Sequence, residues 1–247
     1  MKKIVILGST GSVGKNALEV AARHPKMFKV VGLSAQGNAK LLGRQANRFN
    51  VRNVALGDES RFGELKTTLK SSRRILKGAE GLEEISSLSE ADIVLVAISG
   101  TSAIKPLLAA IRSRKRIALA NKESIVSAGN IIMNMAHSRD VEIIPVDSEH
   151  NSIFQCIEGR DKKEIKEIFL MGTGGPLRNV PKNIFDRLKP SRILRHPVWK
   201  MGKKISVDSA TMMNKGLEII EASHLFGIDT KKISVLLHPE AIIHSMV

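Results

Sequence analysis

The chain has 247 residues, of which 43% are hydrophobic and 26% charged, and its formal net charge is +15. This composition is that of a globular protein and excludes collagen-like, mucin-like and wholly disordered chains. The single cysteine, Cys156, excludes a disulfide framework and a cysteine-based zinc cluster. The apolar runs are shorter than the ~20 residues of a membrane span, and no signal peptide is expected, so we expect a cytoplasmic protein that does not bind membranes.

Short β-rich runs alternate with helical patterns over the first 147 residues. Strands are predicted near 4–7, 30–34, 53–56, 93–97, 116–120 and 142–146, with helices near 12–23, 38–49, 60–70, 102–113 and 123–138. Apolar strands separated by helices are typical of a parallel sheet that is covered on both faces. We therefore expect residues 1–147 to form an α/β domain with a doubly wound, Rossmann-like sheet.

The pattern changes after residue 147. The sequence predicts a helix over 149–158, a strand over 165–171, a short helix over 181–188, a helix over 210–226 and a strand over 233–237. Residues 176–204 contain four prolines and many basic residues, which indicates loop structure. We expect residues 148–247 to form a second α/β domain with a flexible loop at about 195–204, and we expect this domain to be truncated because no closing element follows.

A glycine-rich turn follows the first predicted strand, with glycines at positions 8, 11 and 14. Gly8 permits a tight turn, Gly11 permits the backbone to approach a pyrophosphate, and Gly14 permits a helix to pack closely on the sheet. The amino end of the following helix provides N–H donors for phosphate. The turn therefore favours a dinucleotide site, although a plain strand-to-helix turn remains the alternative.

The second predicted strand ends in the uncharged residues Gln36, Gly37 and Asn38. An NAD site usually has Asp or Glu here to bind the ribose 2′-hydroxyl. Because no carboxylate is present and a polar tip tolerates a 2′-phosphate, we expect NADP. The alternative is that this tip is only a loop.

An acidic pair, Asp147 and Glu149, follows the strand predicted over 142–146. In an extended segment these two side chains would share a face, at the sheet edge where open α/β sheets bind ligands. Hard carboxylate oxygens favour Mg²⁺ or Mn²⁺. The alternative is a helix start that is capped by Asp147 or Ser148 and has Glu149 in its first turn.

A second polar group lies on the helix predicted over 210–226. The spacing of Asn214, Lys215 and Glu218 places the three on one helix face, and Ser209 is expected near the start of this helix. Together these groups are suited to bind a metal and a phosphate. The alternative is an exposed face stabilised by ion pairs.

Two further segments contain residues with more than one possible role. The loop His196-Pro197-Val198-Trp199 lies beside Lys200, Lys203 and Lys204, so Trp199 is interpreted as part of a mobile cover rather than of a core. Lys122 follows the strand at 116–120 and is a candidate Schiff-base lysine, cofactor contact or helix-start residue, between which spacing does not decide.

The positive charge is compatible with an anionic small molecule as well as with nucleic acid. Aromatic residues make up only 3%, and tyrosine is absent, which argues against a stacking platform for single strands. The densest basic run, at 112–116, is interpreted as a solvated connection before a strand. We therefore expect a small-molecule partner and no nucleic acid.

Six motifs, taken together, resemble the 1-deoxy-D-xylulose 5-phosphate reductoisomerase family. They are ILGSTGSVG at 6–14, LANKESIV at 119–126, PVDSEHNSIFQ at 145–155, GTGGP at 172–176, HPVWKMGKKISVDSATMMNKGLE at 196–218 and LHPEAIIHSMV at 237–247. The resemblance implies a homodimeric enzyme of the non-mevalonate isoprenoid pathway. It would convert 1-deoxy-D-xylulose 5-phosphate to 2-C-methyl-D-erythritol 4-phosphate with NADPH and Mg²⁺ or Mn²⁺.

The resemblance also implies residue roles. The metal would be bound by Asp147, Glu149 and Glu218, which together with Lys215 and His196 would be the catalytic residues. The phosphosugar would be bound by Ser148, Glu149, Thr173, His196, Ser209, Asn214, Lys215 and Glu218. NADPH would be bound by Thr10, Gly11, Ser12, Val13, Gln36, Gly37, Asn38, Asn121, Lys122, Glu123 and Gly202, with Met201 near the nicotinamide and Trp199 as cover.

This sequence departs from the family pattern in four respects. Thr173 replaces a serine but keeps the hydroxyl, Lys200 takes a position that is often small, and the tip at 36–38 differs from common versions. The resemblance also implies a further C-terminal helical domain, which we expect to be missing from this chain. A different Rossmann oxidoreductase, which would not need the three carboxylates, is the main alternative.

Overall fold

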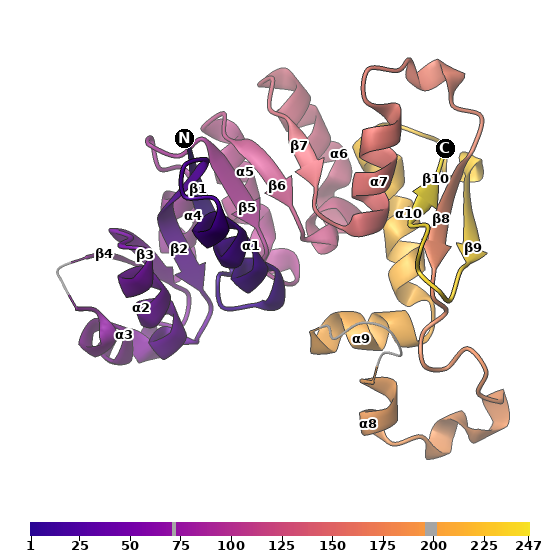
Figure 1. The fold of residues 1–247 in the computed structure, drawn as a ribbon, viewed down its shortest axis with the longest axis horizontal. Helices are drawn as coiled ribbons and strands as arrows, with labels where there is room; N and C mark the ends of the chain where they lie inside the picture. The colour runs from indigo at the N-terminus through magenta and orange to yellow at the C-terminus, as the bar shows by residue number, and fades with distance from the viewer. Residues whose placement is uncertain (71–72, 196–201) are drawn as a thin grey trace. The chain divides into compact units, whose positions relative to one another are not determined.

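The computed structural model describes residues 1–70, 73–195 and 202–247. The chain forms two compact units, Met1–Ile144 and Pro145–Val247. Each unit has its own sheet, and each is described here by itself (Figure 1). In the described residues, no helix is long and apolar enough to cross a membrane.

A seven-stranded sheet forms the centre of the first unit. Its strands are β1 (Lys2–Leu7), β2 (Phe28–Ala35), β3 (Asn53–Leu56), β4 (Arg74–Lys77), β5 (Ile93–Val96), β6 (Arg116–Leu119) and β7 (Ile143–Pro145). They lie in the order β4-β3-β2-β1-β5-β6-β7, and each neighbouring pair from β4 to β6 is parallel. The chain thus builds outward from β1 to β4 and then returns to β5, which creates a switch point between β1 and β5.

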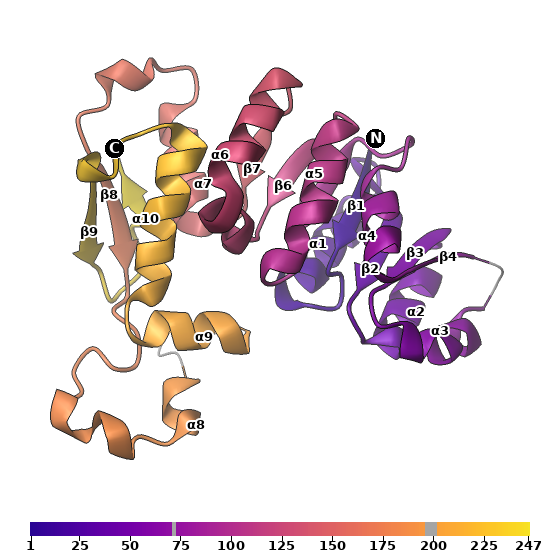
Figure 2. The same ribbon diagram turned by 180° about the vertical axis from the view of Figure 1, so that it is seen from behind.

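Helices cover both faces of this sheet. They are α1 (Ser12–Arg23), α2 (Ala39–Arg48), α3 (Phe62–Thr68), α4 (Gly78–Ser86), α5 (Ile104–Arg112) and α6 (Lys122–Ser138), with short 3₁₀ turns η1 (Glu59–Arg61) and η2 (Thr101–Ala103). Apolar side chains of α1, α2 and α3 form one core with the strands, and α4 and α5 lie on the opposite face (Figure 2). The prediction of a doubly wound α/β fold is confirmed.

The sequence analysis did not predict β4 and α4. The strand Arg74–Lys77 is short, lies at the sheet edge and begins and ends with exposed basic residues, so no apolar alternation marks it. The helix begins at Gly78 and contains Gly81, and both glycines indicate a loop by propensity. Close packing explains Gly81, because a Cβ there would lie 2.6 Å from the backbone carbon of Leu76.

The second unit is built on a smaller sheet. Its strands are β8 (Ile168–Gly172), β9 (Ile233–Leu237) and β10 (Ser245–Met246), in the order β10-β8-β9, and β8 is parallel to β9 and antiparallel to β10. Its helices are α7 (Ser148–Ile157), α8 (Pro190–Ile193), α9 (Lys203–Ala210) and α10 (Met213–Phe226), with 3₁₀ turns η3 (Lys162–Glu164), η4 (Lys182–Arg187) and η5 (Thr230–Lys232). Apolar side chains of α7 and α10 pack with β8 and β9 in one core.

The helix that we predicted over 210–226 is present as α10, but it begins at Met213. A separate helix, α9, ends at Ala210, and Met212 between the two helices has a left-handed backbone with φ 67°. A left-handed residue interrupts the helical hydrogen-bond ladder, so the chain changes direction there. Ser209 consequently lies near the end of α9 and not near the start of the next helix. The expected loop at 176–204 also contains α8 and the start of α9.

The glycine-rich turn depends on close backbone packing at Gly14. A Cβ at this position would contact the carbonyl oxygen of Gly8 and lie 2.6 Å from Cα of Ser9. We expect Gly14→Ala to lower the free energy of unfolding by about 1–3 kcal/mol, because backbone atoms cannot yield as a side chain would. Gly63→Ala in α3 is the matched control, since nothing lies within 4 Å of its Cβ position. It should stabilise slightly, so equal denaturation midpoints for the two variants would contradict the packing argument.

Candidate functional site

Three carboxylates meet in the second unit, at one end of α7 and on the face of α10. Asp147 precedes α7, Glu149 lies in its first turn and Glu218 lies on α10. One oxygen from each of the three lies within 4.8 Å of the others. Segments about seventy residues apart therefore bring their acidic groups together, and three carboxylate oxygens at this spacing are a candidate cation site.

Asp147 and Glu149 are brought together differently from the way that we predicted. Helix α7 begins at Ser148, so the two residues lie at a helix start and not in an extended segment. The side chain of Asp147 makes no capping hydrogen bond to this helix. The helix start that the sequence left open as an alternative is thus the local structure, yet its carboxylates still face Glu218.

Lys215 places its ammonium group among these carboxylates. Its Nζ lies 3.0 Å from Oε1 of Glu149, contacts Oε2 of Glu218 and donates to the carbonyl oxygen of Met171. The side chain is 7% exposed, and that of Glu218 is 1% exposed. Asn214 donates from Nδ2 to the other oxygen of Glu218. Lys215 and Glu218 of the polar face predicted on this helix are therefore buried, Asn214 is half-buried, and Glu218 contacts both of the others.

The surroundings of this cluster raise the pKa of both Glu149 and Lys215, which favours the neutral form of the acid and the charged form of the lysine. Burial raises the pKa of Glu149 above its ordinary value, and the neighbouring charges of Glu218 and Asp147 raise it further. Burial by itself would lower the pKa of Lys215, but the charges of Glu218 and Glu149 outweigh burial and raise the pKa. Lys215 therefore stays charged at neutral pH, and its charge offsets part of the repulsion between the carboxylates.

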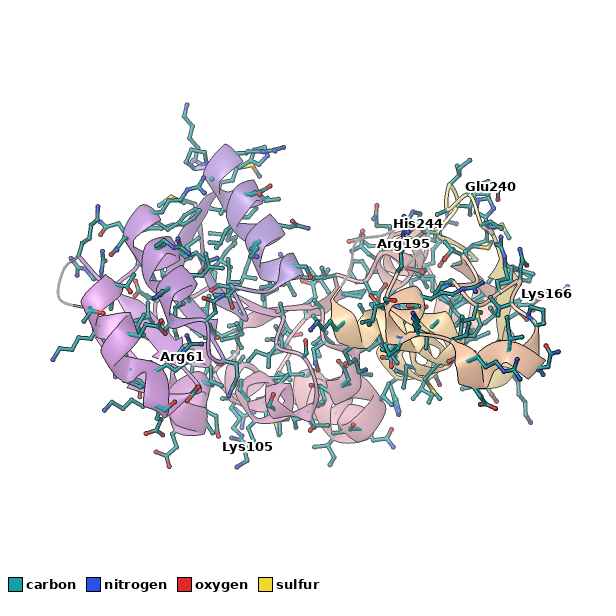
Figure 3. The ribbon with its side chains drawn as sticks, turned by 90° about the horizontal axis from the view of Figure 1, so that it is seen from below. Arg61, Lys105, Lys166, Arg195, Glu240 and His244 are labelled. Atoms are coloured by element: carbon teal, nitrogen blue, oxygen red, sulfur yellow. The ribbon has the colours of Figure 1, made fainter. Side chains whose placement is uncertain are left out.

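The strand β10 fixes the start of α7. Ser245 donates from Oγ to the backbone carbonyl of Glu149 (3.0 Å), and Nδ1 of His244 lies 2.9 Å from Oγ of Ser148. Ser148 in turn donates to Oε2 of Glu149 (2.7 Å). His244, labelled in Figure 3, thus continues a chain of polar contacts that orients the Glu149 carboxylate. The sequence analysis gave His244 and Ser245 no role, because no spacing rule connects them with α7.

A buried pair, His150 and Glu221, joins the two helices beneath the carboxylates. Nε2 of His150 lies 3.0 Å from the backbone carbonyl of Glu218 and 3.5 Å from Oε2 of Glu221. Both side chains are at most 2% exposed, and the imidazole stacks on Phe226. The contact holds α7 against the turn of α10 that carries Glu218. Sequence reasoning missed the pair, although each member lies one helical turn beyond a predicted carboxylate.

The glycine turn after β8 lies against two residues that were predicted to bind substrate. A Cβ on Gly172 would lie 3.1 Å from Cε of Lys215, and a Cβ on Gly175 would clash with the carbonyl oxygen of Ser209. Thr173 lies between these two glycines, and its carbonyl accepts a hydrogen bond from Arg178 (2.9 Å). The structure therefore places Thr173, Ser209 and Lys215 around one turn at the carboxyl end of β8.

The glycine-rich turn of the first unit has the geometry of a phosphate-binding turn. Gly8 has φ +83°, and a Cβ there would lie 2.5 Å from the carbonyl oxygen of Ala97, at the switch point beside β5. Its N–H donates to the carbonyl of Ser34 (3.1 Å), which ties the turn to β2. Helix α1 begins at Ser12 without a side-chain cap. The predicted residues Thr10, Gly11, Ser12 and Val13 therefore form the turn and the amino end of the helix.

Most of the other predicted cofactor residues follow β2 or β6 of the same sheet. Gln36, Gly37 and Asn38 follow β2, and Asn38 caps α2 by accepting the N–H of Leu41 (3.2 Å). Asn121 caps α6 and donates from Nδ2 to the carbonyl of Ile98 (2.7 Å). Lys122 is a buried residue at the start of α6, so of the three roles left open the helix-start position is the observed one.

Part of the predicted site falls outside the described residues. The residues concerned are His196, Trp199, Lys200 and Met201. Gly202, the next residue, precedes α9, and its carbonyl accepts hydrogen bonds from the backbone N–H and the hydroxyl of Ser206.

The family is shown by two matches that together cover most of the chain. Residues 4–129 match the model of 1-deoxy-D-xylulose 5-phosphate reductoisomerase, and residues 143–226 match the model of its C-terminal domain. The chain belongs to this reductoisomerase family. The resemblance inferred from the six motifs is therefore confirmed, and the alternative of an unrelated Rossmann oxidoreductase is excluded.

Relatives in the family are similar over the whole chain. The reductoisomerase of Thermoanaerobacter sp. (strain X514) is 47% identical over 247 residues, and that of Chlamydia trachomatis serovar L2 (strain ATCC VR-902B) is 46% identical over 248 residues. Both alignments include 100% of this chain, but only 64% and 65% of the relatives. The chain thus spans about 64% of the length of the first of these relatives.

Solved structures of family members have the same fold. The enzyme of Zymomonas mobilis in complex with NADPH is 41% identical with a TM-score of 0.90, and the match covers 99% of this chain and 63% of that one. A DOX-P reductoisomerase in complex with NADPH, fosmidomycin and magnesium is 35% identical with a TM-score of 0.94, over 99% of this chain and 63% of that one. NADPH, fosmidomycin and magnesium are ligands of those solved structures.

Proposed function

We propose that this chain supplies the dinucleotide turn and the metal and substrate groups of an enzyme that converts 1-deoxy-D-xylulose 5-phosphate to 2-C-methyl-D-erythritol 4-phosphate. NADPH would be oxidised in the reaction, and Mg²⁺ or Mn²⁺ would be required. The observation that carries the proposal is the convergence of Asp147, Glu149 and Glu218 within 4.8 Å. Family membership supports the reaction and the cofactors.

The residues present fit a divalent cation. The three groups offer hard carboxylate oxygens, which Mg²⁺ and Mn²⁺ prefer. Burial raises the pKa of Glu149, and the repulsion from the other two carboxylates raises it further. A bound cation would reduce the electrostatic repulsion between the three carboxylates. The cluster already accommodates one positive group, because the ammonium of Lys215 contacts Glu149 and Glu218.

The chain's own residues would bind and orient the substrate. A divalent ion would act as a Lewis acid on the substrate oxygens, while NADPH would provide the hydride. Lys215 would donate hydrogen bonds to anionic oxygens of the phosphosugar, with Ser209, Asn214 and Thr173 placed near it around the turn after β8. Asn214 orients Glu218, and Ser148 orients Glu149 through their hydrogen bonds. His196 and Trp199 are proposed as the cover that excludes water.

The cofactor would lie on the first unit. Thr10, Gly11, Ser12 and Val13 would bind the pyrophosphate at the amino end of α1, where uncapped N–H groups and the helix dipole favour an anion. Asn121, Lys122 and Glu123 would contact the rest of the dinucleotide, and Gly202, which belongs to the second unit, stays a predicted cofactor residue. We propose a cytoplasmic homodimer that acts in the non-mevalonate isoprenoid pathway, with family membership as the support.

The test measures the oxidation of NADPH by the protein. The loss of absorbance of the reduced nicotinamide monitors this reaction. We expect oxidation only when both the phosphosugar and Mg²⁺ or Mn²⁺ are present, complete loss with EDTA and recovery when the ion is added back. Binding of NADPH and Mn²⁺ to the 247-residue chain, measured by fluorescence and electron paramagnetic resonance, gives a readout that does not depend on turnover. Hydride transfer that is unaffected by EDTA would refute the proposal.

A further inference from the structure

The carboxyl ends of β2 and β3 form a single polar corner in the first unit. The two strands are parallel neighbours in which Ala35 pairs with Leu56. Beyond the strands, the N–H of Asp58 donates to the carbonyl of Gln36 (2.7 Å), so the two loops stay together. In a Rossmann-like fold the adenosine ribose of a dinucleotide lies at the end of the second strand, next to the glycine-rich turn. This corner therefore decides between a ribose 2′-hydroxyl and a 2′-phosphate.

Two side chains of opposite charge lie beside Gly37 in this corner. The position that a Cβ of Gly37 would take is 3.7 Å from Oδ2 of Asp58 and 4.0 Å from Cδ of Arg61. Asp58 is engaged in local structure, because its Oδ1 accepts hydrogen bonds from the N–H (3.1 Å) and the hydroxyl (2.6 Å) of Ser60. It caps η1, the turn that ends at Arg61. The carboxylate thus holds the loop that positions the arginine.

Arg61 and Lys40 both reach one anionic group. Nη2 of Arg61 lies 2.7 Å from one oxygen of Glu64, and Nζ of Lys40 lies 3.6 Å from the other. Both cations are exposed, at 46% and 71% of their side-chain surface, so these ion pairs contribute little to stability. A phosphate dianion can therefore replace the Glu64 carboxylate as the partner of both cations with little loss of stability. The Arg61 guanidinium can donate two hydrogen bonds to the oxygens of the phosphate.

We propose that Arg61, assisted by Lys40, binds the 2′-phosphate of the dinucleotide and sets the preference of this chain for NADPH over NADH. The inference deepens the proposed function and rests on it. The tip Gln36-Gly37-Asn38 carries no charge of its own, so the cation comes from η1 beyond the next strand. Glu64 holds both cations near the corner when no dinucleotide is bound. Figure 3 labels Arg61 on the first unit.

The test compares equilibrium binding of NADPH and NADH to the chain by fluorescence or calorimetry. We expect Arg61→Ala to weaken NADPH binding about tenfold or more and to leave NADH binding within roughly twofold, because only NADPH has the 2′-phosphate. Lys40→Ala should act in the same direction with a smaller effect. Lys66→Ala, which removes an exposed charge from α3, is the matched control and should change neither affinity.

Glu64→Gln separates a binding role of Arg61 from a structural one. If Arg61 acts on phosphate, removing the competing carboxylate should preserve or tighten NADPH binding, whereas Arg61→Ala weakens it. If Arg61 serves only to pair with Glu64, the two variants will behave alike, and the inference is overturned. An unchanged NADPH to NADH ratio in Arg61→Ala, or equal affinities in the parent chain, overturns it as well. A parent chain that binds neither dinucleotide instead refutes the proposed function.

Discussion

Replacing Glu218 with glutamine is expected to weaken Mn²⁺ binding by at least about 100-fold and to reduce metal-dependent NADPH oxidation by a similar factor or more. Glu218 is 1% exposed and lies within 4.8 Å of Asp147 and Glu149. An amide carries no charge, and its single carbonyl oxygen is a weaker ligand than a carboxylate, so the three-carboxylate site is lost while the side-chain volume is kept. Electron paramagnetic resonance of Mn²⁺ measures the affinity, and the absorbance assay measures turnover.

The matched control for this variant is Glu158→Gln. Glu158 is exposed just beyond α7, so the substitution removes one negative charge from the same unit without touching the carboxylates. It should change neither metal affinity nor turnover. Glu218→Asp keeps the charge on a shorter side chain and should fall between the parent protein and the glutamine variant. Parent-like Mn²⁺ affinity in Glu218→Gln would refute the assigned metal ligand.

Replacing Lys215 with methionine is expected to separate turnover from metal binding. The ammonium contacts Glu149 and Glu218, so it competes with a metal ion for the same oxygens. Its removal should leave Mn²⁺ binding unchanged or tighter, while turnover falls by at least about 100-fold because the substrate loses its cationic donor. Without the ion, the free energy of unfolding should fall by about 3–5 kcal/mol, since a buried carboxylate loses its partner.

Divalent cations should restore much of that lost stability, and thermal melts with and without Mg²⁺ measure the recovery. The control is Lys163→Met, which removes an exposed charge near η3 and should leave stability and turnover unchanged. If Lys215→Met lost metal affinity together with turnover, the lysine would be needed to build the carboxylate cluster, and its role toward the substrate would be refuted.

The sequence predicted the fold of the first unit because its strands are continuous apolar runs that end in glycine or polar residues. It did not predict β4 and α4, where exposed basic residues and two glycines conceal short edge elements that only tertiary packing explains. The break at Met212 was missed for a related reason. The segment 203–226 has helix-forming residues on both sides of a left-handed residue, and no glycine or proline marks the change.

The candidate site was predictable where residues are close in sequence and less so where they are distant. The shared face of Asn214, Lys215 and Glu218 follows from helical spacing. By contrast, the contacts of His150 with the Glu218 carbonyl and of His244 with Ser148 join segments 68 and 96 positions apart. No local periodicity encodes such contacts, since they depend on how α7, α10 and β10 pack.

The contacts of β10 with the start of α7 also bear on the order of events during synthesis by the ribosome. The hydrogen-bond partners of the Ser148 hydroxyl and the Glu149 backbone carbonyl, His244 and Ser245, each lie 96 positions downstream. A nascent chain can therefore complete the seven-stranded sheet of the first unit well before the carboxylate of Glu149 is oriented. If the carboxylates bind a metal ion as proposed, we expect its capture to be a late step, and translation arrested before residue 244 should yield a chain that binds a dinucleotide but retains no metal.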